Sequence, residues 1–499
     1  MPAEHVDVLI VGAGLSGIGA AAHLQDALPG ASWAIVEARD AIGGTWDLFR
    51  YPGVRSDSDM FTLGYRFRPW TDERAIADGA AIREYLRDTA RERGIDRRVR
   101  FGHRVVAAEW SSATARWTVT TRTDGGTVEL TCGFLYLCTG YYRYDRGHAP
   151  ALPGAERFRG ALVHPQTWPA DLDWTGKRVV VVGSGATAVT LVPALAGDAA
   201  HVTMLQRSPS YLVSVPTRDP LARRLFGRFP ARRVAPLVRA RNVALVTLFY
   251  RLCRRFPTRM RRRLLADVRA QLPPGFDVDT HFSPAYAPWD QRVCFVPGGD
   301  LFRAVRAGRA SVVTDRISTL TEQGVALASG AELPADVVVT ATGLSLQALG
   351  GAALRVDGRE VDVSRATVYK GALLSGVPNL ALTFGYTNAS WTLKADLVAG
   401  YVCRLLRHMR AHGHAVVVPD GPPAGPDGLP PLIDLRAGYV RRGAALLPRR
   451  GLAGPWRLVN SYPRDLLTLR HGRVDDGHLR FTAADPAAPE PARRQEAAA

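Results

Sequence analysis

The sequence predicts an α/β fold, because an apolar strand, a glycine-rich turn and a helix follow one another twice along its 499 residues. The first copy runs from the apolar segment 7–11 through Gly12-Ala-Gly14-Leu-Ser16-Gly17 into the alanine-rich segment 18–28. The second runs from 178–182 into Gly183-Ser184-Gly185-Ala186-Thr187-Ala188, where alanine replaces the third glycine. This strand–turn–helix context is the one that a dinucleotide fingerprint requires. We therefore expect two Rossmann-like dinucleotide-binding domains.

The residues of the first copy suit a dinucleotide whose ribose carries two free hydroxyls. Gly12 permits the tight turn, Gly14 lets backbone amides approach a pyrophosphate, and Gly17 lets the helix pack closely on the strand. The helix N-terminus offers unpaired N–H groups to the phosphates. The next strand, 33–36, ends in Glu37, at the position where a carboxylate accepts hydrogen bonds from both ribose hydroxyls. We expect FAD at this site.

The second copy ends differently. Its following strand, 201–206, leads into Arg207 and Ser208, and the offset of Arg207 from Gly183 is almost that of Glu37 from Gly12. An arginine at this position suits a 2′-phosphate, whereas a carboxylate would repel it. Arg207 could also be one more of the chain's many arginines, but Ser208 beside it adds a second donor. We expect NADPH at this site.

A loop between the two copies carries a distinctive spacing, Phe158-Arg-Gly160-Ala-Leu-Val-His164-Pro-Gln-Thr-Trp168-Pro169. Taken alone it would be a packed connector. Its pattern F-x-G-x-x-x-H-x-x-x-W-P resembles the signature of type I Baeyer–Villiger monooxygenases in the flavin-containing monooxygenase superfamily. Simple N- and S-oxidising flavin monooxygenases generally lack the final Trp-Pro. From about residue 7 to about residue 480 the chain is similar to this family, and most to its ethionamide-activating enzymes.

This resemblance implies a paired-nucleotide flavoprotein and a set of cofactor contacts. The long irregular loop 43–57 would wrap the flavin, and loops of this length inside compact domains are usually functional. Its end would approach both the flavin ring and the nicotinamide. The implied FAD contacts are Gly12, Gly14, Ser16, Gly17, Glu37, Gly44, Thr45, Trp46, Asp47, Leu48, Asp57 and Val105. The implied NADPH contacts are Arg55, Ser56, Gly183, Ser184, Gly185, Ala186, Thr187, Ala188, Arg207 and Ser208.

The resemblance also implies the chemistry. Arg292 matches the arginine that stabilises the flavin peroxide, and Asp57 would orient it. The family commonly has lysine just before this arginine, where this chain has Gln291, so preference for NADPH would rest on Arg207 and Ser208. The implied reaction uses O2 and a C4a-peroxyflavin to convert ketones to esters or lactones, with S-oxidation of sulfides and thioamides. An N- or S-hydroxylating flavin monooxygenase is the alternative. His164 would couple the domains rather than transfer protons.

Other segments indicate how the domains divide. Segments 99–110 and 117–123 alternate in polarity and turn at Asp124-Gly125-Gly126, which predicts a hairpin or meander. Asn388-Ala-Ser-Trp391-Thr-Leu-Lys394 predicts a capped helix start, either facing the flavin or simply packing Trp391 in the core. We expect FAD-binding parts at 1–145 and 373–481, NADP-binding parts at 146–216 and 288–372, a helical insertion at 217–287, broken by prolines 230, 236 and 257, and a disordered tail at 482–499.

The net charge limits which kinds of binding partner the sequence supports. The net charge is +18, and all cations except Lys177, Lys370 and Lys394 are arginines, so a solvated arginine-rich surface is the leading interpretation. Nucleic-acid binding is disfavoured because no known binding motif accompanies the charge. Peripheral association of 217–272 with anionic membrane stays open.

The cysteines and the apolar segments indicate the cellular compartment. Five scattered cysteines indicate a reducing, cytoplasmic compartment, and no export signal is visible. The apolar run 243–253 is too short to span a bilayer.

Overall fold

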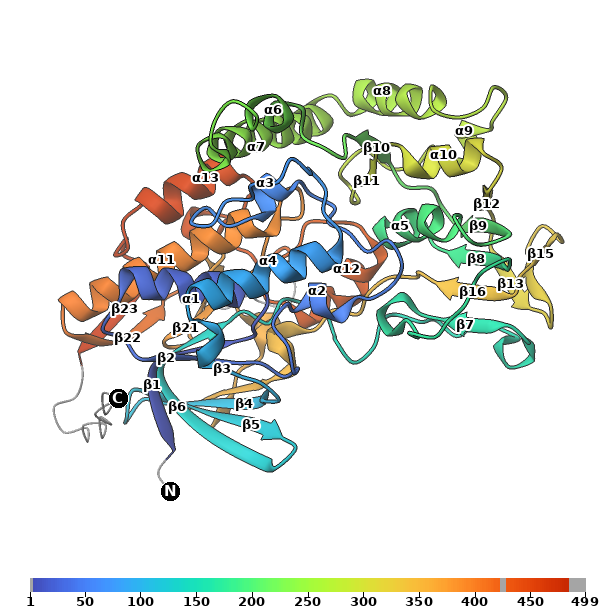
Figure 1. Cartoon of the computed structure of the whole chain (residues 1–499). Helices are drawn as coiled ribbons and strands as arrows, with labels where there is room; N and C mark the ends of the chain where they lie inside the picture. Colours follow the sequence, from blue (N-terminus) through green and yellow to red (C-terminus); the bar gives the residue numbers. More distant parts are fainter. Residues whose placement is uncertain (1–2, 422–427, 484–499) are drawn as a thin grey trace.

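Two separate sheets organise the computed structural model, which describes residues 3–421 and 428–483 (Figure 1). The first has eleven strands, with the main order β18-β17-β4-β5-β6-β1-β2-β3 and with β21, β20 and β19 added through β6. The second has five parallel strands in the order β12-β9-β8-β16-β7. This arrangement confirms the predicted α/β class with two Rossmann-like domains.

The bounds of the strands are as follows. The first sheet contains β1 (Glu4–Val11), β2 (Trp33–Val36), β3 (Val99–Arg100), β4 (Arg104–Ser111), β5 (Arg116–Thr123), β6 (Gly126–Leu137), β17 (Ala353–Val356), β18 (Arg359–Glu360), β19 (Val368–Tyr369), β20 (Leu373–Leu374) and β21 (Leu380–Leu382). The second contains β7 (Ala161–Val163), β8 (Arg178–Val182), β9 (His201–Gln206), β12 (Ala310–Thr314) and β16 (Val337–Thr340). Smaller sheets pair β10 (Leu212–Val215) with β11 (Cys294–Pro297), β14 (Gly324–Leu327) with β13 (Ile317–Leu320) and β15 (Glu332–Pro334), and β22 (His414–Pro419) with β23 (Leu479–Ala483).

Strand β1 is central to the first sheet and is apolar because both of its faces are covered. It pairs in parallel with β2 and β6. On one face Ile10 and Ile35 pack beneath α1 (Leu15–Ala27), α4 (Gly79–Glu92) and α11 (Trp391–Ala411). On the other face Leu9 packs with Trp110 and Trp117 of the predicted meander β4-β5-β6. Parallel strands that are covered on both faces form continuous hydrophobic runs, as residues 8–11 do.

The second sheet is covered in the same way. The helices α5 (Ala186–Leu195) and α10 (Asp300–Arg306) pack on one face, where Val179, Val181 and Val339 are buried. The small sheet β13–β15 covers the other face over Val180 and Val338. The alternation of buried valines along β8 therefore follows the period of two that a strand imposes.

The chain crosses between the two sheets twice. The first crossing lies between β6 and β7, and the return lies between β16 and β17. Because β17 pairs in parallel with β4, the chain has rejoined the first sheet by Ala353, before the boundary at residue 373 that we expected. We therefore propose that the second FAD-binding part begins between 341 and 353.

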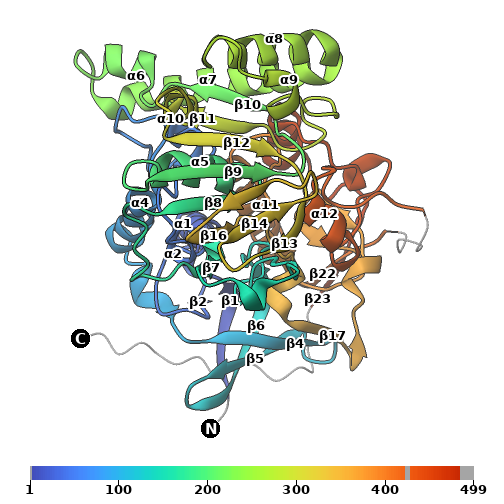
Figure 2. The same cartoon turned by 90° about the vertical axis from the view of Figure 1, so that its right-hand side faces the viewer.

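Four helices between β10 and β11 form the helical insertion at the top of Figures 1 and 2. They are α6 (Pro220–Leu225), α7 (Ala231–Arg255), α8 (Pro257–Arg269) and α9 (Val278–His281). Pro230 and Pro257 stand at helix starts, as predicted, but the break expected at Pro236 is wrong. Pro236 lies in the second turn of the long helix α7, where it removes one backbone hydrogen bond. The buried Val234, Ala235 and Val238 hold the helix through this position.

The remaining expectations concern the tail, the cysteines and the membrane. Strand β23 reaches Ala483, so the first two residues of the expected tail are ordered in a strand, and 484–499 lie outside the described residues. All five cysteines are buried and free, as expected. Within 3–421 and 428–483, no helix has the length and apolar character needed to cross a membrane. The other short helices are α2 (Thr45–Leu48), α3 (Met60–Leu63), α12 (Gly438–Gly443) and α13 (Tyr462–Asp465).

A pair of glycines tests the packing of the first sheet. A Cβ at Gly17 would lie 1.8 Å from the carbonyl oxygen of Gly12, whereas a Cβ at Gly400, inside α11, would have no neighbour within 4 Å. We expect Gly17→Ala to destabilise the chain by about 1–3 kcal/mol through overpacking. Gly400→Ala should stabilise it by about 0.5–1 kcal/mol, because alanine favours helix. Thermal unfolding measures both, and an unchanged midpoint for Gly17→Ala would contradict this packing.

Candidate active site and cofactor cavity

One cavity of about 1050 Å³ extends between the two sheets. Both glycine turns open onto it, so two dinucleotide motifs that lie far apart in the sequence share one space. The predicted residues on its wall are Gly12, Gly14, Ser16, Glu37, Gly44, Thr45, Trp46, Arg55, Ser56, Asp57, Val105, Gly183, Ser184, Gly185, Ala186, Thr187, Arg207, Ser208 and Arg292. A cavity of this volume, whose wall has both polar and apolar parts, accommodates two extended cofactors.

In the first half, two glycine loops lie back to back. A Cβ at Gly44 would lie 2.9 Å from the Cα of Gly14, so the loop at Gly44 leaves no room for a side chain at this contact. Glu37 is buried at the end of β2, and its carboxylate accepts hydrogen bonds from the backbone N–H groups of Ala13 (2.7 Å) and Arg39 (2.9 Å). Burial raises the pKa of Glu37, although these hydrogen bonds act against the shift. The carboxylate is thus fixed on the cavity wall beside the turn.

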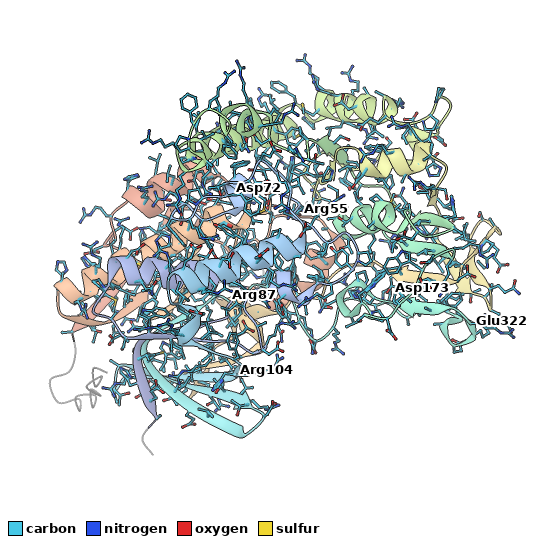
Figure 3. All side chains as sticks on the ribbon, in the orientation of Figure 1. Arg55, Asp72, Arg87, Arg104, Asp173 and Glu322 are labelled. Carbon is cyan, nitrogen blue, oxygen red and sulfur yellow. The ribbon has the colours of Figure 1, made fainter. Side chains whose placement is uncertain are left out.

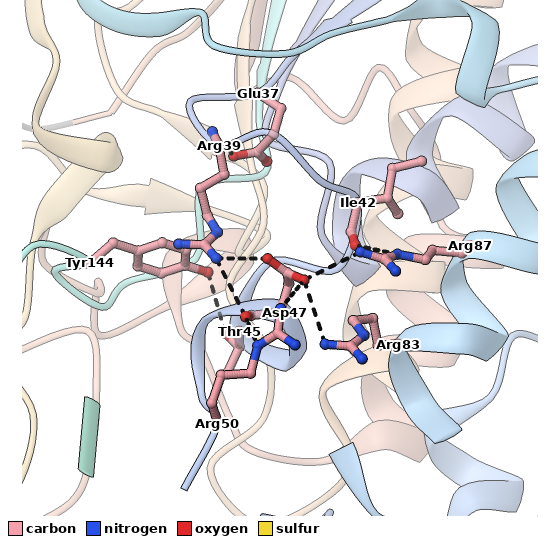
Figure 4. Close-up of polar contacts among 9 residues, drawn as sticks. All are labelled: Glu37, Arg39, Ile42, Thr45, Asp47, Arg50, Arg83, Arg87 and Tyr144. Carbon is pink, nitrogen blue, oxygen red and sulfur yellow. Dashed lines mark hydrogen bonds and ion pairs between the residues drawn. The ribbon is translucent and has the colours of Figure 1, made fainter. Parts of the chain in front are cut away.

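Asp47 does not line that wall, and its expected contact with FAD stays a prediction. Its carboxylate is 2% exposed and pairs with Arg39 (2.6 Å) and Arg50 (2.7 Å), with Arg87 and Arg83 at 3.4 and 3.8 Å (Figure 4). It therefore acts on the cavity through Arg39, which stands on the wall next to Glu37. No sequence pattern predicts this cluster, because its arginines come from separate segments.

Three other predicted contacts, Gly17, Leu48 and Ala188, also lie off the cavity wall as the described residues define it. A Cβ at Gly17 would meet Gly12 and Ile10, and Ala188 is buried in the core of the second sheet. The expected contacts of these three residues with the cofactors stay predictions.

In the half of the cavity beside the second sheet, the glycine turn that begins at Gly183 has free space where a ligand would approach. A Cβ at Gly183 would lie 2.4 Å from the carbonyl oxygen of Ala341, but a Cβ at Gly185 would have no neighbour within 4 Å. Arg207 is exposed on the wall, and within the described part of the chain its guanidinium has no hydrogen-bond or ion-pair partner. Ser184 donates from Oγ to the carbonyl oxygen of Ser208 (2.8 Å), which ties the turn to this edge.

The two halves meet at Asp57 and Arg292. Their side chains form an ion pair of 2.5 Å, and both also line a second, mainly apolar cavity of about 610 Å³. Burial works against the charge on Arg292, but the carboxylate of Asp57 and the nearby tyrosines raise the pKa of Arg292 above its ordinary value. Arg292 is therefore a permanent cation at the junction of a polar and an apolar cavity.

The tyrosines beside Arg292 were not predicted. Tyr141 and Tyr142 directly follow the Thr-Gly end of β6 and hydrogen-bond through their hydroxyls (3.1 Å), and Tyr439 comes from α12. Burial raises the pKa of all three hydroxyls, so they stay protonated. Trp391 stacks on Tyr141 and lines the cavity, so the start of α11 does face this space rather than only the core. Ser390 caps α11 in position, but its hydroxyl makes no capping hydrogen bond.

Arg55 connects the flavin-side loop to the second sheet. Its guanidinium pairs with Asp300 at the start of α10, and Figure 3 shows it near the centre of the molecule. Its neighbour Ser56 is buried on the wall, and the Ser56 hydroxyl has no partner among the described residues. The Nε atom of Arg39 is also buried and has no hydrogen-bond partner among the described residues. These orphaned groups and the open face of Gly185 fit two phosphate-linked cofactors.

The loop 158–169 lies behind the cavity and contacts the crossing segment. The amide of Gln166 donates to the carbonyl oxygens of Arg143 (2.8 Å) and Tyr144 (3.0 Å). The His164 ring lies against Gly147, where a Cβ would come within 1.9 Å of Cε1, and burial lowers the pKa of His164. Phe158, Gly160, Trp168 and Pro169 do not reach the cavity in the part of the chain that the structure describes. The expected role of His164 in coupling the domains stays a prediction.

Two family models match the chain. The model described as flavin-binding monooxygenase-like matches residues 69–224, and the model of an NAD(P)-binding Rossmann-like domain matches residues 10–70. The FAD-containing monooxygenase EthA of Mycobacterium tuberculosis is 54% identical over 479 residues, which cover 96% of this chain and 98% of that protein. The probable FAD-binding monooxygenase AlmA of Acinetobacter baylyi is 46% identical over 481 residues, which cover 96% of each chain.

Solved structures agree on the fold. An oxidized steroid monooxygenase bound to NADP matches with a TM-score of 0.73 at 22% identity, over 96% of this chain and all of that one. Because more than half of its residues are identical to those of a curated relative over nearly the full length of both, the chain belongs to the flavin-binding monooxygenase-like family and is a flavoprotein monooxygenase.

Proposed function

We propose that the chain is an FAD- and NADPH-dependent Baeyer–Villiger monooxygenase that inserts one oxygen atom of O2 into ketones to give esters or lactones, and that also oxidises sulfur in sulfides and thioamides. The Arg292–Asp57 ion pair at the junction of the polar and apolar cavities carries this proposal. When bound, FAD takes hydride from NADPH and passes the electrons to O2, which makes the oxygen atom available to the substrate. Five buried thiols support a reducing, cytoplasmic compartment.

The two ends of the cavity discriminate between the cofactors by charge. Glu37, held by two backbone N–H groups, accepts hydrogen bonds from the ribose hydroxyls of FAD. Arg207, free of protein partners in the described chain, binds the 2′-phosphate of NADPH with Ser208 beside it. The match of 10–70 to an NAD(P)-binding model reflects the shared strand–turn–helix, and Glu37 is what favours FAD there.

Arg292 supplies a fixed positive charge to the reacting centre. Its cation stabilises the negative charge that develops on the carbonyl oxygen of the ketone when oxygen adds to the carbon. Asp57 orients the guanidinium, and Tyr141, Tyr142 and Tyr439 lie near it. Electrostatic stabilisation of this kind works without reorganisation because the charge is already in place.

The apolar cavity accepts the body of the substrate. Its wall comes from α7, from the segment after Thr387 and from Val459 to Tyr462. In this wall Ser390 is 3% exposed, and its hydroxyl has no partner within the described residues. A buried hydroxyl without a partner is costly, so it favours a ligand that accepts its hydrogen bond. We assign Ser390 as the donor that positions the polar atom of the substrate.

The alternative is an N- or S-hydroxylating monooxygenase of the same fold. The Trp168-Pro169 end of the fingerprint favours the Baeyer–Villiger enzyme. Oxidation of a simple aliphatic ketone distinguishes the two, because only the Baeyer–Villiger enzyme yields an ester. A purified, FAD-loaded chain that oxidises a sulfide but gives no ester from any ketone in a graded series would favour the alternative.

Replacement of Arg292 tests its role in oxygen transfer. We expect Arg292→Ala to leave reduction of FAD by NADPH intact and to lower ester formation by about 10²–10³-fold, as for loss of an oxyanion donor. Anaerobic stopped-flow absorbance measures reduction, and gas chromatography measures the ester. Arg292→Lys should retain part of the activity. A normal ester yield from Arg292→Ala would remove Arg292 from the mechanism.

Replacement of Arg207 tests the choice of nicotinamide cofactor. A hydrogen bond to a charged group contributes about 1.5–3 kcal/mol, so Arg207→Ala should raise KM for NADPH by about 10–100-fold. The KM for NADH should not change, because NADH lacks the 2′-phosphate. Arg309→Ala, an exposed arginine off the cavity wall, is the matched control. Equal losses with both cofactors would show that Arg207 acts on the fold instead.

Replacement of Ser390 tests substrate positioning. A neutral hydrogen bond contributes about 0.5–1.5 kcal/mol, so Ser390→Ala should raise KM for the ketone by about 2–10-fold. The KM for NADPH should stay constant. Ser461→Ala, on the same wall but partly exposed, serves as the control. Steady-state kinetics with one ketone decides, and an unchanged KM for the ketone would exclude this role.

A further inference from the structure

The outer face of the helical insertion carries an exposed apolar stripe. On α7, Leu237, Ala240, Ala244 and Leu248 are exposed and recur at the spacing of one helix face. The buried residues Val234, Val238 and Asn242 occupy another face. Leu237 and Leu248 are each more than half exposed, as are Leu245 on the same helix and Phe229 just before it. A contiguous apolar surface of this kind marks an interaction site.

The charge around the stripe is almost entirely positive. Between residues 220 and 270 there are fifteen arginines and one acidic residue, Asp267. Residues 242–250 carry no charge, and Arg233 and Arg255 are exposed on the stripe's own face near its two ends. An apolar helix face bounded by arginines suits a partner that has an anionic outer layer over an apolar interior. A second copy of the chain would instead bring two cationic faces together.

The stripe is continuous with the apolar cavity. Leu245 is exposed and also lines that cavity, together with Val243 and Val246 of the same helix. The inner side of α7 is fastened to the active-site loop, because the Nδ2 of Asn242 donates to Asp59 (2.9 Å), two residues after Asp57. Arg239 donates to the carbonyl oxygens of Phe61 (2.9 Å) and Gly64 (2.6 Å). One helix therefore separates the outer surface from the reacting centre.

We propose that the α6–α8 end of the molecule, at the top of Figure 1, lies on an anionic lipid membrane. Leu237 and Leu248 enter the apolar layer of the membrane, and the arginines contact lipid phosphates. An apolar substrate then passes from the bilayer past Leu245 into the cavity beneath α7. The docking stands on the surface alone, whereas this delivery step rests on the proposed function.

Flotation of the FAD-loaded chain with vesicles tests the docking. We expect binding to mixed vesicles of phosphatidylcholine and phosphatidylglycerol, weaker binding at high salt, and little binding to phosphatidylcholine alone. Leu237→Gln/Leu248→Gln should weaken binding at least tenfold, since glutamine keeps helix propensity but not the apolar face. Arg233→Gln/Arg255→Gln should weaken only the part of the vesicle binding that depends on anionic lipid. Phe101→Gln/Val128→Gln, at exposed sites by β3 and on β6, is the matched control and should bind normally.

A second readout separates docking from catalysis. Neither Leu237 nor Leu248 lines the cofactor cavity or the apolar cavity, so their double variant should oxidise a short water-soluble ketone at the normal rate. It should lose most of its rate on a long-chain ketone dissolved in the anionic vesicles. Equal vesicle binding by the double variant and the native chain would overturn the proposal. So would light scattering that shows a dimer dissociated by the double variant, with no vesicle binding by either protein.

Discussion

The ion pair between Arg292 and Asp57 is the contact on which the site depends. Asp57 ends the loop that follows the first dinucleotide motif, and Arg292 precedes β11 beyond the helical insertion, so the two are distant in sequence. The carboxylate of Asp57 offsets the cost of desolvating the Arg292 guanidinium and raises the pKa of Arg292. The ion pair therefore requires a fixed distance between the two sheets. The two segments that cross between the sheets maintain this distance. The backbone amides of Arg143 and His148 donate to the carbonyl oxygens of Ser345 and Gly343. The side-chain amide of Gln166, in the loop 158–169, donates to the carbonyl oxygen of Arg143 in the first crossing segment.

Sequence reasoning was effective where local geometry determines chemistry. A glycine turn between a strand and a helix has few conformations, so the positions of Gly12 and Gly183 on the cavity wall followed from spacing alone. The same holds for Glu37 and Arg207, because the end of the second strand is always close to the first turn. Arg292 is different. Among the many arginines of the chain no local pattern distinguishes it, and only the resemblance to the family singled it out.

The features that were missed depend on contacts distant in sequence. Asp47 is held away from the cavity by arginines that come from the loop and from α4, and no single segment contains that cluster. Tyr439 reaches Arg292 from a helix with no motif. The helix α7 continues through Pro236 because tertiary burial of its neighbours outweighs the lost hydrogen bond. The return of the chain at β17 depends on a pairing with β4, from which the whole second sheet separates it in sequence. Local propensity carries no information about such contacts.

The cofactor cavity and the apolar cavity have different origins, and this separates two functions of the enzyme. The first is built from turns at the ends of strands, where a side chain added at Gly12, Gly44 or Gly183 would collide with neighbouring backbone. The second is built largely from α7 and from C-terminal loops, which lie outside both sheets. Substrate preference can therefore change through side chains of the insertion while the cofactor sites stay intact. The limit is the inner face of α7, where Asn242 bonds Asp59 and Asp219 and where Arg239 caps α3. Changes there would reach Asp57, so variation is tolerated on the outer face and at the rim near Leu245, but not at this anchor.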